Sequence, residues 1–372
     1  MARTKQGGND IWQKTPEPAP NWWPVSPADV RHHFRTYAKR GAVRRLCRSA
    51  GSRDIWVYEL GHGKSLVRTS NYSAAQGSTD VRSYLGHQRK GYRQTLLLVA
   101  GVHGMEVEAI AGMVNLLHIL EHGKDLRGRR WPAIRHFAKR LRLLIVPLAN
   151  PDGRARTHIP SLVGLTGEDQ AYYGQGMWKD GTLITWLGSK QFMPLPLEKV
   201  IFSGGYPNDD GVNLMHDVSP AGSLAKETQA LIKLAEDEII DACLNMHSYP
   251  FNPALLPHAS HCPTAYHKHT YVLAKSVQNR LQKAGLRPMK IPAKNYRSER
   301  SGSFNMPSAM HHASGCLSLC FESPHGIKEI PYTYEELLDI QLLAIEETMR
   351  FGVEERFRPE ENKRGGDVPW KS

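Results

Sequence analysis

The sequence has no apolar run long enough to cross a bilayer, which takes about 18 residues or more. Its first residues, MARTKQGGNDIWQ, contain no apolar core of a signal peptide, so we expect no secretory signal. Cysteine is also scarce, because the 372 residues include only five, an odd number without regular spacing. No disulfide framework is expected, and the sequence favours reduced thiols and a cytoplasmic location.

The charge is unbalanced but not concentrated. Lys and Arg number 48 against 36 Asp and Glu, a net charge of +12. The excess recurs in separate stretches such as RRWPAIRHFAKRLR, and no basic motif interleaved with aromatic residues accompanies it. The pattern therefore favours a basic surface that attracts acidic substrates over a nucleic-acid groove, and nucleic acid is not an expected partner.

Strand-like and helix-like segments alternate along the chain. Apolar runs predict strands in 52–61, 93–102, 141–149 and 316–324, and apolar residues at helical spacing predict helices over 105–123 and 333–352. The stretch 225–249 predicts a helix that leads into a short strand. This order predicts an α/β fold with a largely parallel or mixed sheet covered by helices on both faces. We expect a single domain over 28–352, between an extended N-terminal arm (1–27) and a C-terminal tail (353–372). Residues 161–210 show no clear period and are expected to form a long surface excursion.

Three predicted strands end in residues suited to bind a metal. His103 follows the strand in 93–102, and Glu106 lies three residues further on; His247 ends a second strand and Glu322 a third. Open α/β sheets bind ligands at the carboxyl ends of their strands. A catalytic zinc takes three protein ligands and leaves a position for water, while a nearby carboxylate moves protons. The HxxE pair alone is weak evidence, because it is also typical of a helix start with a hydrogen-bonded histidine.

The motifs together resemble those of the zinc metallocarboxypeptidases and their amidohydrolase relatives. GVHGMEVEA is similar to the first metal motif of that family and NMHSY to the second, and ANPDGRARTH, AKETQAL and LCFESPHG match further segments in order over about 28–350. The resemblance implies a central twisted, mostly parallel mixed sheet with one zinc ion per chain. It also implies that His103, Glu106 and His247 bind the zinc and that Glu322 is the general base and acid.

The sequence departs from the family at the residues that contact substrate. GMWKD places Lys179 where the family has an arginine that stabilises the oxyanion. GVNLMHD places Met215 and His216 where the family has an Asn-Arg pair that grips the substrate carboxylate. A lysine lacks the planar fork of arginine, and loss of the arginine removes the strongest carboxylate clamp.

Other residues are candidates for the substrate site. Arg154 and Arg156 are candidates to replace the missing clamp or, alternatively, partners of the turn that they follow, and Arg297 and Arg300 are further candidates for the clamp. Tyr249 ends the NMHSY motif, and a loose match in KNYRSERSGSFNM suggests Tyr296 and Phe304. A second group of possible ligands, His258, His261, Cys262, His267 and His269, lacks zinc-finger spacing and is interpreted as polar loop residues.

These patterns predict a zinc-dependent hydrolase that cleaves an amide or peptide bond, carboxypeptidase-like but with altered recognition of the substrate carboxylate. The expected substrate is a peptide or an acylated amino acid. One alternative is an N-acyl amino acid deacylase similar to succinylglutamate desuccinylase or aspartoacylase. The other is a non-catalytic binding protein on the same fold, although such a protein has no need for Glu322.

Overall fold

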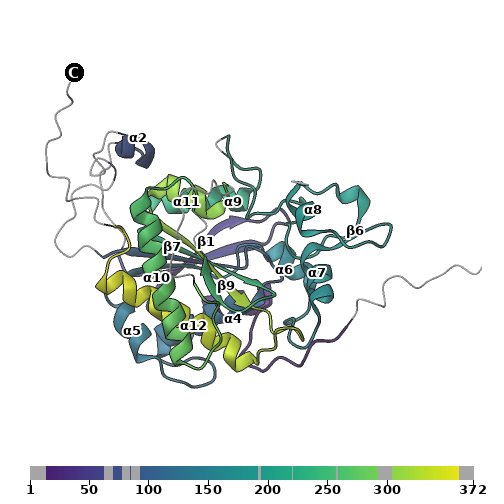
Figure 1. Ribbon diagram of the computed structural model, residues 1–372, viewed down its shortest axis with the longest axis horizontal. Helices are drawn as coiled ribbons and strands as arrows, with labels where there is room; N and C mark the ends of the chain where they lie inside the picture. The colour runs from purple at the N-terminus through teal and green to yellow at the C-terminus, as the bar shows by residue number, and fades with distance from the viewer. Residues whose placement is uncertain are drawn as a thin grey trace, which may run out of the picture.

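The computed structural model describes residues 14–62, 70–77, 84, 93–191, 194–219, 221–256, 259–291 and 304–359. A seven-stranded sheet in the order β1-β2-β4-β3-β7-β9-β8 forms its centre (Figure 1). The strands are β1 (Ala42–Arg48), β2 (Asp54–Leu60), β3 (Thr95–Ala100), β4 (Arg142–Val146), β7 (Ala242–Tyr249), β8 (Ala254–Leu256) and β9 (Leu317–Pro324). A separate two-stranded sheet pairs β5 (Met177–Trp178) with β6 (Val200–Phe202).

The helices surround this sheet. They are α1 (Pro27–Tyr37), α2 (Tyr72–Gly77), α4 (Val107–His122), α5 (Pro132–Ala138), α6 (Pro151–Thr157), α7 (Gly167–Gln175), α8 (Trp186–Gln191), α9 (Lys226–Asp237), α10 (Thr264–Lys283), α11 (Met306–Ser314) and α12 (Tyr334–Glu354). A 3-10 turn spans Leu197–Lys199. Where the sequence predicts the end of a helix at Gly123, α4 ends with that glycine at φ 82°, a conformation that glycine adopts at little cost.

The sheet is mixed, with a parallel centre. Strands β4, β3, β7 and β9 pair in parallel, whereas β2 and β8 run antiparallel to their neighbours. Successive side chains of a strand point to opposite faces, and β3 shows this clearly. Leu96, Leu98 and Ala100 belong to one core and Leu97 and Val99 to the other. The continuous apolar run in 93–102 is therefore explained by burial on both faces, and the predicted fold class is confirmed.

Two unequal cores result from this alternation. Helices α1, α4, α5, α10 and α12 supply residues to the larger core, and α9 and α11 to the smaller one. Figure 1 shows α10 and α12 together on one side of the sheet, with α9 and α11 on another. The smaller core matters for function, because alternate residues of β7 and β9 that face it include His247 and Glu322.

Some elements were not expected from the sequence. Strand β1, which pairs antiparallel with β2, carries three arginines and no long apolar run. Helices α10 and α11 were also missed, and His267 and His269, interpreted as loop residues, lie in α10. The unperiodic segment 161–210 contains α7, α8 and the β5–β6 pair. All five cysteines are free, as expected.

The N-terminal arm contacts the body of the protein where it is described. Trp23 is buried, its ring packs edge-on against Tyr334 at a centroid distance of 5.1 Å, and its Nε1 donates to the Pro160 carbonyl. Ser26 then caps α1 by accepting a hydrogen bond from the Asp29 N–H. The predicted boundaries at residues 27 and 352 lie close to the start of α1 and the end of α12. Among the described helices, none is both long and apolar enough to cross a membrane.

Candidate metal centre

Strand register brings the predicted ligands together. In the parallel pair of β7 and β9, His247 is the direct partner of Glu322. Ala100, the last residue of β3, pairs with Met246, so the loop that carries His103 leaves the sheet beside His247. Partners in register project to the same face. The three strand ends therefore place His103, His247 and Glu322 at one edge of the sheet, as the sequence predicts.

Three buried residues converge there within ligand distance of one another. His103 Nδ1 lies 2.7 Å from Glu106 Oε1, and His247 Nδ1 lies 2.8 Å from Glu106 Oε2. One ligating atom from each residue lies within 4.8 Å of the other two, the only such group of three among the described residues. Two imidazole nitrogens and a carboxylate are a donor set typical of zinc. The arrangement fits the metal that the sequence predicts.

The surroundings set the charge on the two carboxylates differently. Burial acts to raise the pKa of Glu106, but His103 and His247 outweigh it and hold that pKa far below the usual range. Burial raises the pKa of Glu322 to about 7; His247 opposes this shift and Glu106 adds to it. Glu322 Oε2 is buried without a hydrogen-bond partner among the described residues. One carboxylate is thus suited to bind a cation and the other to exchange a proton.

Asn213 orients the first histidine. Its Oδ1 lies 3.1 Å from His103 Nε2, which leaves Nδ1 to face the ligand position. The same oxygen accepts from the Met215 N–H at 3.1 Å. A hydrogen bond to the far ring nitrogen fixes the tautomer and orientation of a metal-binding histidine. Sequence analysis did not assign this role to Asn213, although the residue lies in the GVNLMHD segment that it singled out.

Close backbone contacts hold the loop that carries His103 and Glu106. The Gly104 N–H donates to the Gly205 carbonyl at 2.7 Å. A Cβ on Gly104 would lie 2.1 Å from the Arg154 backbone nitrogen, so no side chain fits here. Arg154 is buried, and its guanidinium donates to the carbonyls of Gly104 and Ile159. Arg154 thus supports the loop, in agreement with its alternative interpretation as a partner of the turn.

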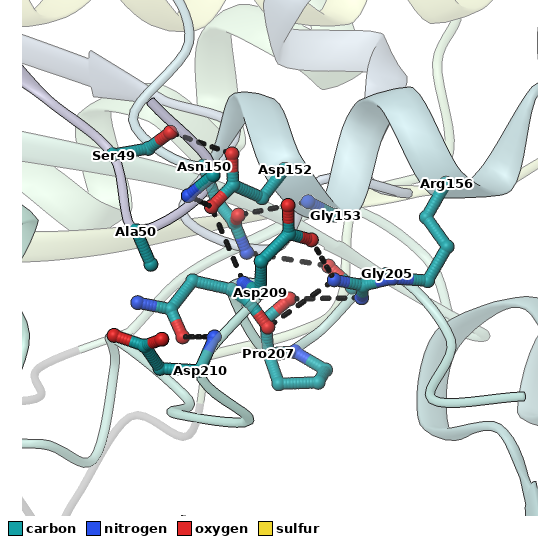
Figure 2. Close-up of polar contacts among 12 residues, drawn as sticks. Ser49, Ala50, Asn150, Asp152, Gly153, Arg156, Gly205, Pro207, Asp209 and Asp210 are labelled. Carbon is teal, nitrogen blue, oxygen red and sulfur yellow. Dashed lines mark hydrogen bonds and ion pairs between the residues drawn. The ribbon is translucent and has the colours of Figure 1, made fainter. Parts of the chain in front are cut away.

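A charged network holds the NPDG turn from the other side (Figure 2). Buried Asp152 accepts from Ser49 Oγ at 2.5 Å, from the Gly51 N–H at 2.8 Å and from Arg53 Nη1 at 2.8 Å. Asp209 accepts from Arg53 and from Arg156. Arg156 also donates to three carbonyls in the 204–208 segment, so its side chain is engaged within the protein. In this network two arginines, Arg53 and Arg156, balance the negative charges of Asp152 and Asp209.

Aromatic rings form a wall beside His103. Tyr206 is buried with its ring centroid 4.2 Å from that of His103. The Trp186 ring lies 6.4 Å from His103 and 5.9 Å from His216, centroid to centroid. Lys190 Nζ lies 4.6 Å from the centre of the Trp186 ring. His216 therefore contacts the same tryptophan as His103 does. The sequence did not predict Trp186 or Lys190 at the site.

The other predicted site residues lie in separate places. Lys179 is exposed at the turn after β5, where its N–H donates to the Lys199 carbonyl. Tyr249 is half-buried at the end of β7, and its hydroxyl donates to the Asn252 carbonyl at 2.7 Å. Phe304 precedes α11, with its ring 5.5 Å from that of His312. Tyr296 lies outside the described residues, as do Arg297, Arg300 and His258.

Comparison with known proteins supports this picture. The sequence model of the zinc carboxypeptidase family matches residues 30–185, which include His103 and Glu106. No curated protein sequence matches the chain significantly.

Solved metallocarboxypeptidases share the fold. A metallo-carboxypeptidase from Burkholderia cenocepacia superposes with a TM-score of 0.53 at 13% identity, over 87% of this chain and 67% of that one. A metallo-carboxypeptidase from Pseudomonas aeruginosa, in complex with (2-guanidinoethylmercapto)succinic acid, gives 0.51 at 12% identity, over 87% and 67%. Bovine thrombin-activatable fibrinolysis inhibitor, in complex with tick carboxypeptidase inhibitor, gives 0.54 at 12% identity, over 90% of this chain and 100% of that one. The chain spans about two thirds of the length of the bacterial structures.

Proposed function

We propose that the chain is a member of the zinc carboxypeptidase family and a zinc-dependent hydrolase of amide or peptide bonds; the match to the family model over residues 30–185 and the shared fold support this. The observation that carries the proposal is the buried convergence of His103, Glu106 and His247, with Glu322 opposite His247 on the next strand. The fold and the family support a metallohydrolase in general, and the cleavage of a particular bond is our inference.

Each residue has a separate part in the proposed reaction. His103, Glu106 and His247 would hold one zinc ion, and zinc supplies Lewis acidity that activates water and polarises a carbonyl. Glu322 takes the proton of the attacking water and delivers it to the leaving nitrogen. Its raised pKa suits this exchange, because a base with a pKa near 7 can both accept and release a proton at neutral pH. Asn213 holds the His103 ring in place.

The substrate-contacting residues separate this chain from an ordinary carboxypeptidase. Arg154 and Arg156 are engaged with backbone carbonyls and Asp209, which argues against either as the replacement for the missing arginine. The proposed oxyanion role of Lys179 rests on the resemblance alone. Contact with Trp186 favours His216 as a residue of the substrate site. Tyr249 and Phe304 stay predictions, as does Tyr296.

Metal content tests the proposal first. Purified protein supplied with zinc should contain about one zinc ion per chain by mass spectrometry, and the double variant His103→Ala, His247→Ala should contain none. A matched control, His32→Ala, replaces an exposed histidine on α1 and should retain the metal. Zinc that persists in the double variant, or no zinc in any of the three proteins, would disprove the metal centre. A panel of peptides and acylated amino acids then separates a peptidase from a deacylase.

A further inference from the structure

The wall of the metal centre contains a cation that the proposed reaction does not use. Lys190 lies one helical turn after Trp186 in α8, so both side chains project from the same side of that short helix. Its Nζ lies over the face of the Trp186 ring, 4.6 Å from the ring centre. The same ring is a neighbour of both His103 and His216. A single aromatic ring thus lies between this ammonium group and a predicted zinc ligand.

Lys190 lacks the partners that occupy Arg154 and Arg156. Arg156 is paired with Asp209, and Arg154 is buried against carbonyl oxygens. Among the residues that the structure describes, no carboxylate forms an ion pair with Lys190. Its side chain is partly buried, and this burial lowers its pKa from the usual value. A partly desolvated ammonium group that lies over an aromatic ring binds an anion more strongly than an exposed lysine does.

The position is suited to the part of the substrate next to the cleaved bond. His216 stands where the resemblance places the carboxylate-binding arginine, and a histidine is a weaker and pH-dependent clamp. The Trp186 ring contacts His216, so Lys190 brings a positive charge to the same neighbourhood from a different element. Trp186 and Leu187 are also exposed, at 38% and 63%. The positive charge of Lys190 and the exposed apolar surface of Trp186 and Leu187 therefore lie side by side.

We propose that Lys190 and Trp186 form a subsite for a carboxylate group of the substrate, with the apolar part of the substrate against the indole ring. This inference rests on the proposed function, because it takes the metal centre as the place of cleavage. It assigns the missing carboxylate recognition to the 161–210 segment. The substrate class that follows is a small amide with a free carboxylate and an apolar group nearby.

A pair of ligands that differ in one carboxylate tests this subsite without turnover. Benzylsuccinate has one carboxylate that can bind a metal and a second that remains for Lys190, whereas 4-phenylbutanoate lacks the second. Binding of both compounds is measured by calorimetry on the full chain, once supplied with zinc and once treated with a chelator. The proteins are wild type, Lys190→Met, Lys190→Arg and Lys199→Met, the last replacing an exposed lysine of the same segment.

We expect wild type to prefer benzylsuccinate. Lys190→Met should weaken benzylsuccinate binding roughly tenfold and leave 4-phenylbutanoate nearly unchanged, because one charge-assisted contact is lost. Lys190→Arg should retain most of the preference, and Lys199→Met should behave as wild type.

Other outcomes overturn one proposal at a time. A preference that survives in Lys190→Met, or that Lys199→Met loses equally, refutes the subsite. So does a wild type that binds neither compound, whatever its zinc content. A Lys190-dependent preference that is identical with and without zinc supports the anion subsite and counts against the metal centre.

Discussion

The network around Asp152 and the cluster around Glu106 are each built around a buried carboxylate. They lie on either side of the backbone contact between Gly104 and Gly205. Around Asp152, donors meet acceptors, and the positive charges of Arg53 and Arg156 balance the negative charges of Asp152 and Asp209. Around Glu106, a carboxylate faces two histidines, and Glu322 Oε2 and His247 Nε2 are buried without hydrogen-bond partners among the described residues. Buried polar groups normally find partners, so unsatisfied ones indicate a site that awaits a ligand. The first cluster maintains structure and the second is arranged for chemistry.

Removal of the proton carrier should have the largest effect on activity. We expect Glu322→Gln to lower kcat by roughly a thousandfold, as loss of a general base does, while zinc content stays at the wild-type level. Steady-state hydrolysis and metal analysis of the same preparation check this. The exposed Glu198→Gln serves as the control. A Glu322→Gln enzyme with wild-type kcat would show that the proton takes another route.

Substitutions in the Asp152 network should instead lower the free energy of unfolding. Asp152→Ala leaves the Ser49 hydroxyl and the Gly51 N–H without their acceptor and leaves Arg53 only Asp209, so we expect the free energy of unfolding to fall by about 3 kcal/mol. Asp54→Ala, which breaks only partly exposed pairs with Arg45 and Arg48, should cost at most about 1 kcal/mol. Urea denaturation measures both. Equal losses would mean that the burial of Asp152 does not matter.

Asn213 tests whether orientation of a ligand affects metal affinity. Asn213→Leu removes the acceptor for His103 Nε2 and should weaken zinc binding about tenfold. Asn213→Asp keeps an acceptor at that place and should bind zinc at least as tightly as wild type. Competition with a chromophoric chelator gives both affinities. If both variants bind like wild type, Asn213 has no positioning role.

The last expected effect is a pH dependence of stability in zinc-free protein. Burial raises the pKa of Glu322 to about 7 in the folded chain, above the ordinary 4.5 of a glutamate side chain, so the folded state holds its proton more tightly. This contribution to stability is therefore complete below about pH 4.5 and is lost as pH rises through about 7. We expect the free energy of unfolding to fall by at most about 3 kcal/mol between these limits. Wild type and Glu322→Gln are compared by denaturation at each pH, and parallel curves would contradict the assignment.

Much of the metal centre could be predicted because it depends on strand ends. His103, Glu106, His247 and Glu322 follow apolar runs that are buried on both faces, and such runs are easily recognised in a sequence. Strand β1 was missed because a partly exposed edge strand with three arginines carries little hydrophobic signal. The site walls were missed for a different reason. Trp186 and Lys190 reach the centre through the path of the 161–210 segment, and this path follows from tertiary contacts rather than from a local period.

The pairing of His247 with Glu322 has a consequence for how the protein matures. These residues lie far apart in the sequence and become neighbours only through the parallel register of β7 with β9. A slip of one residue would turn one of them to the opposite face of the sheet. The ability to capture zinc should therefore arise late in folding, together with the completed sheet. The time course of zinc uptake during refolding would then show when β7 and β9 pair in their native register.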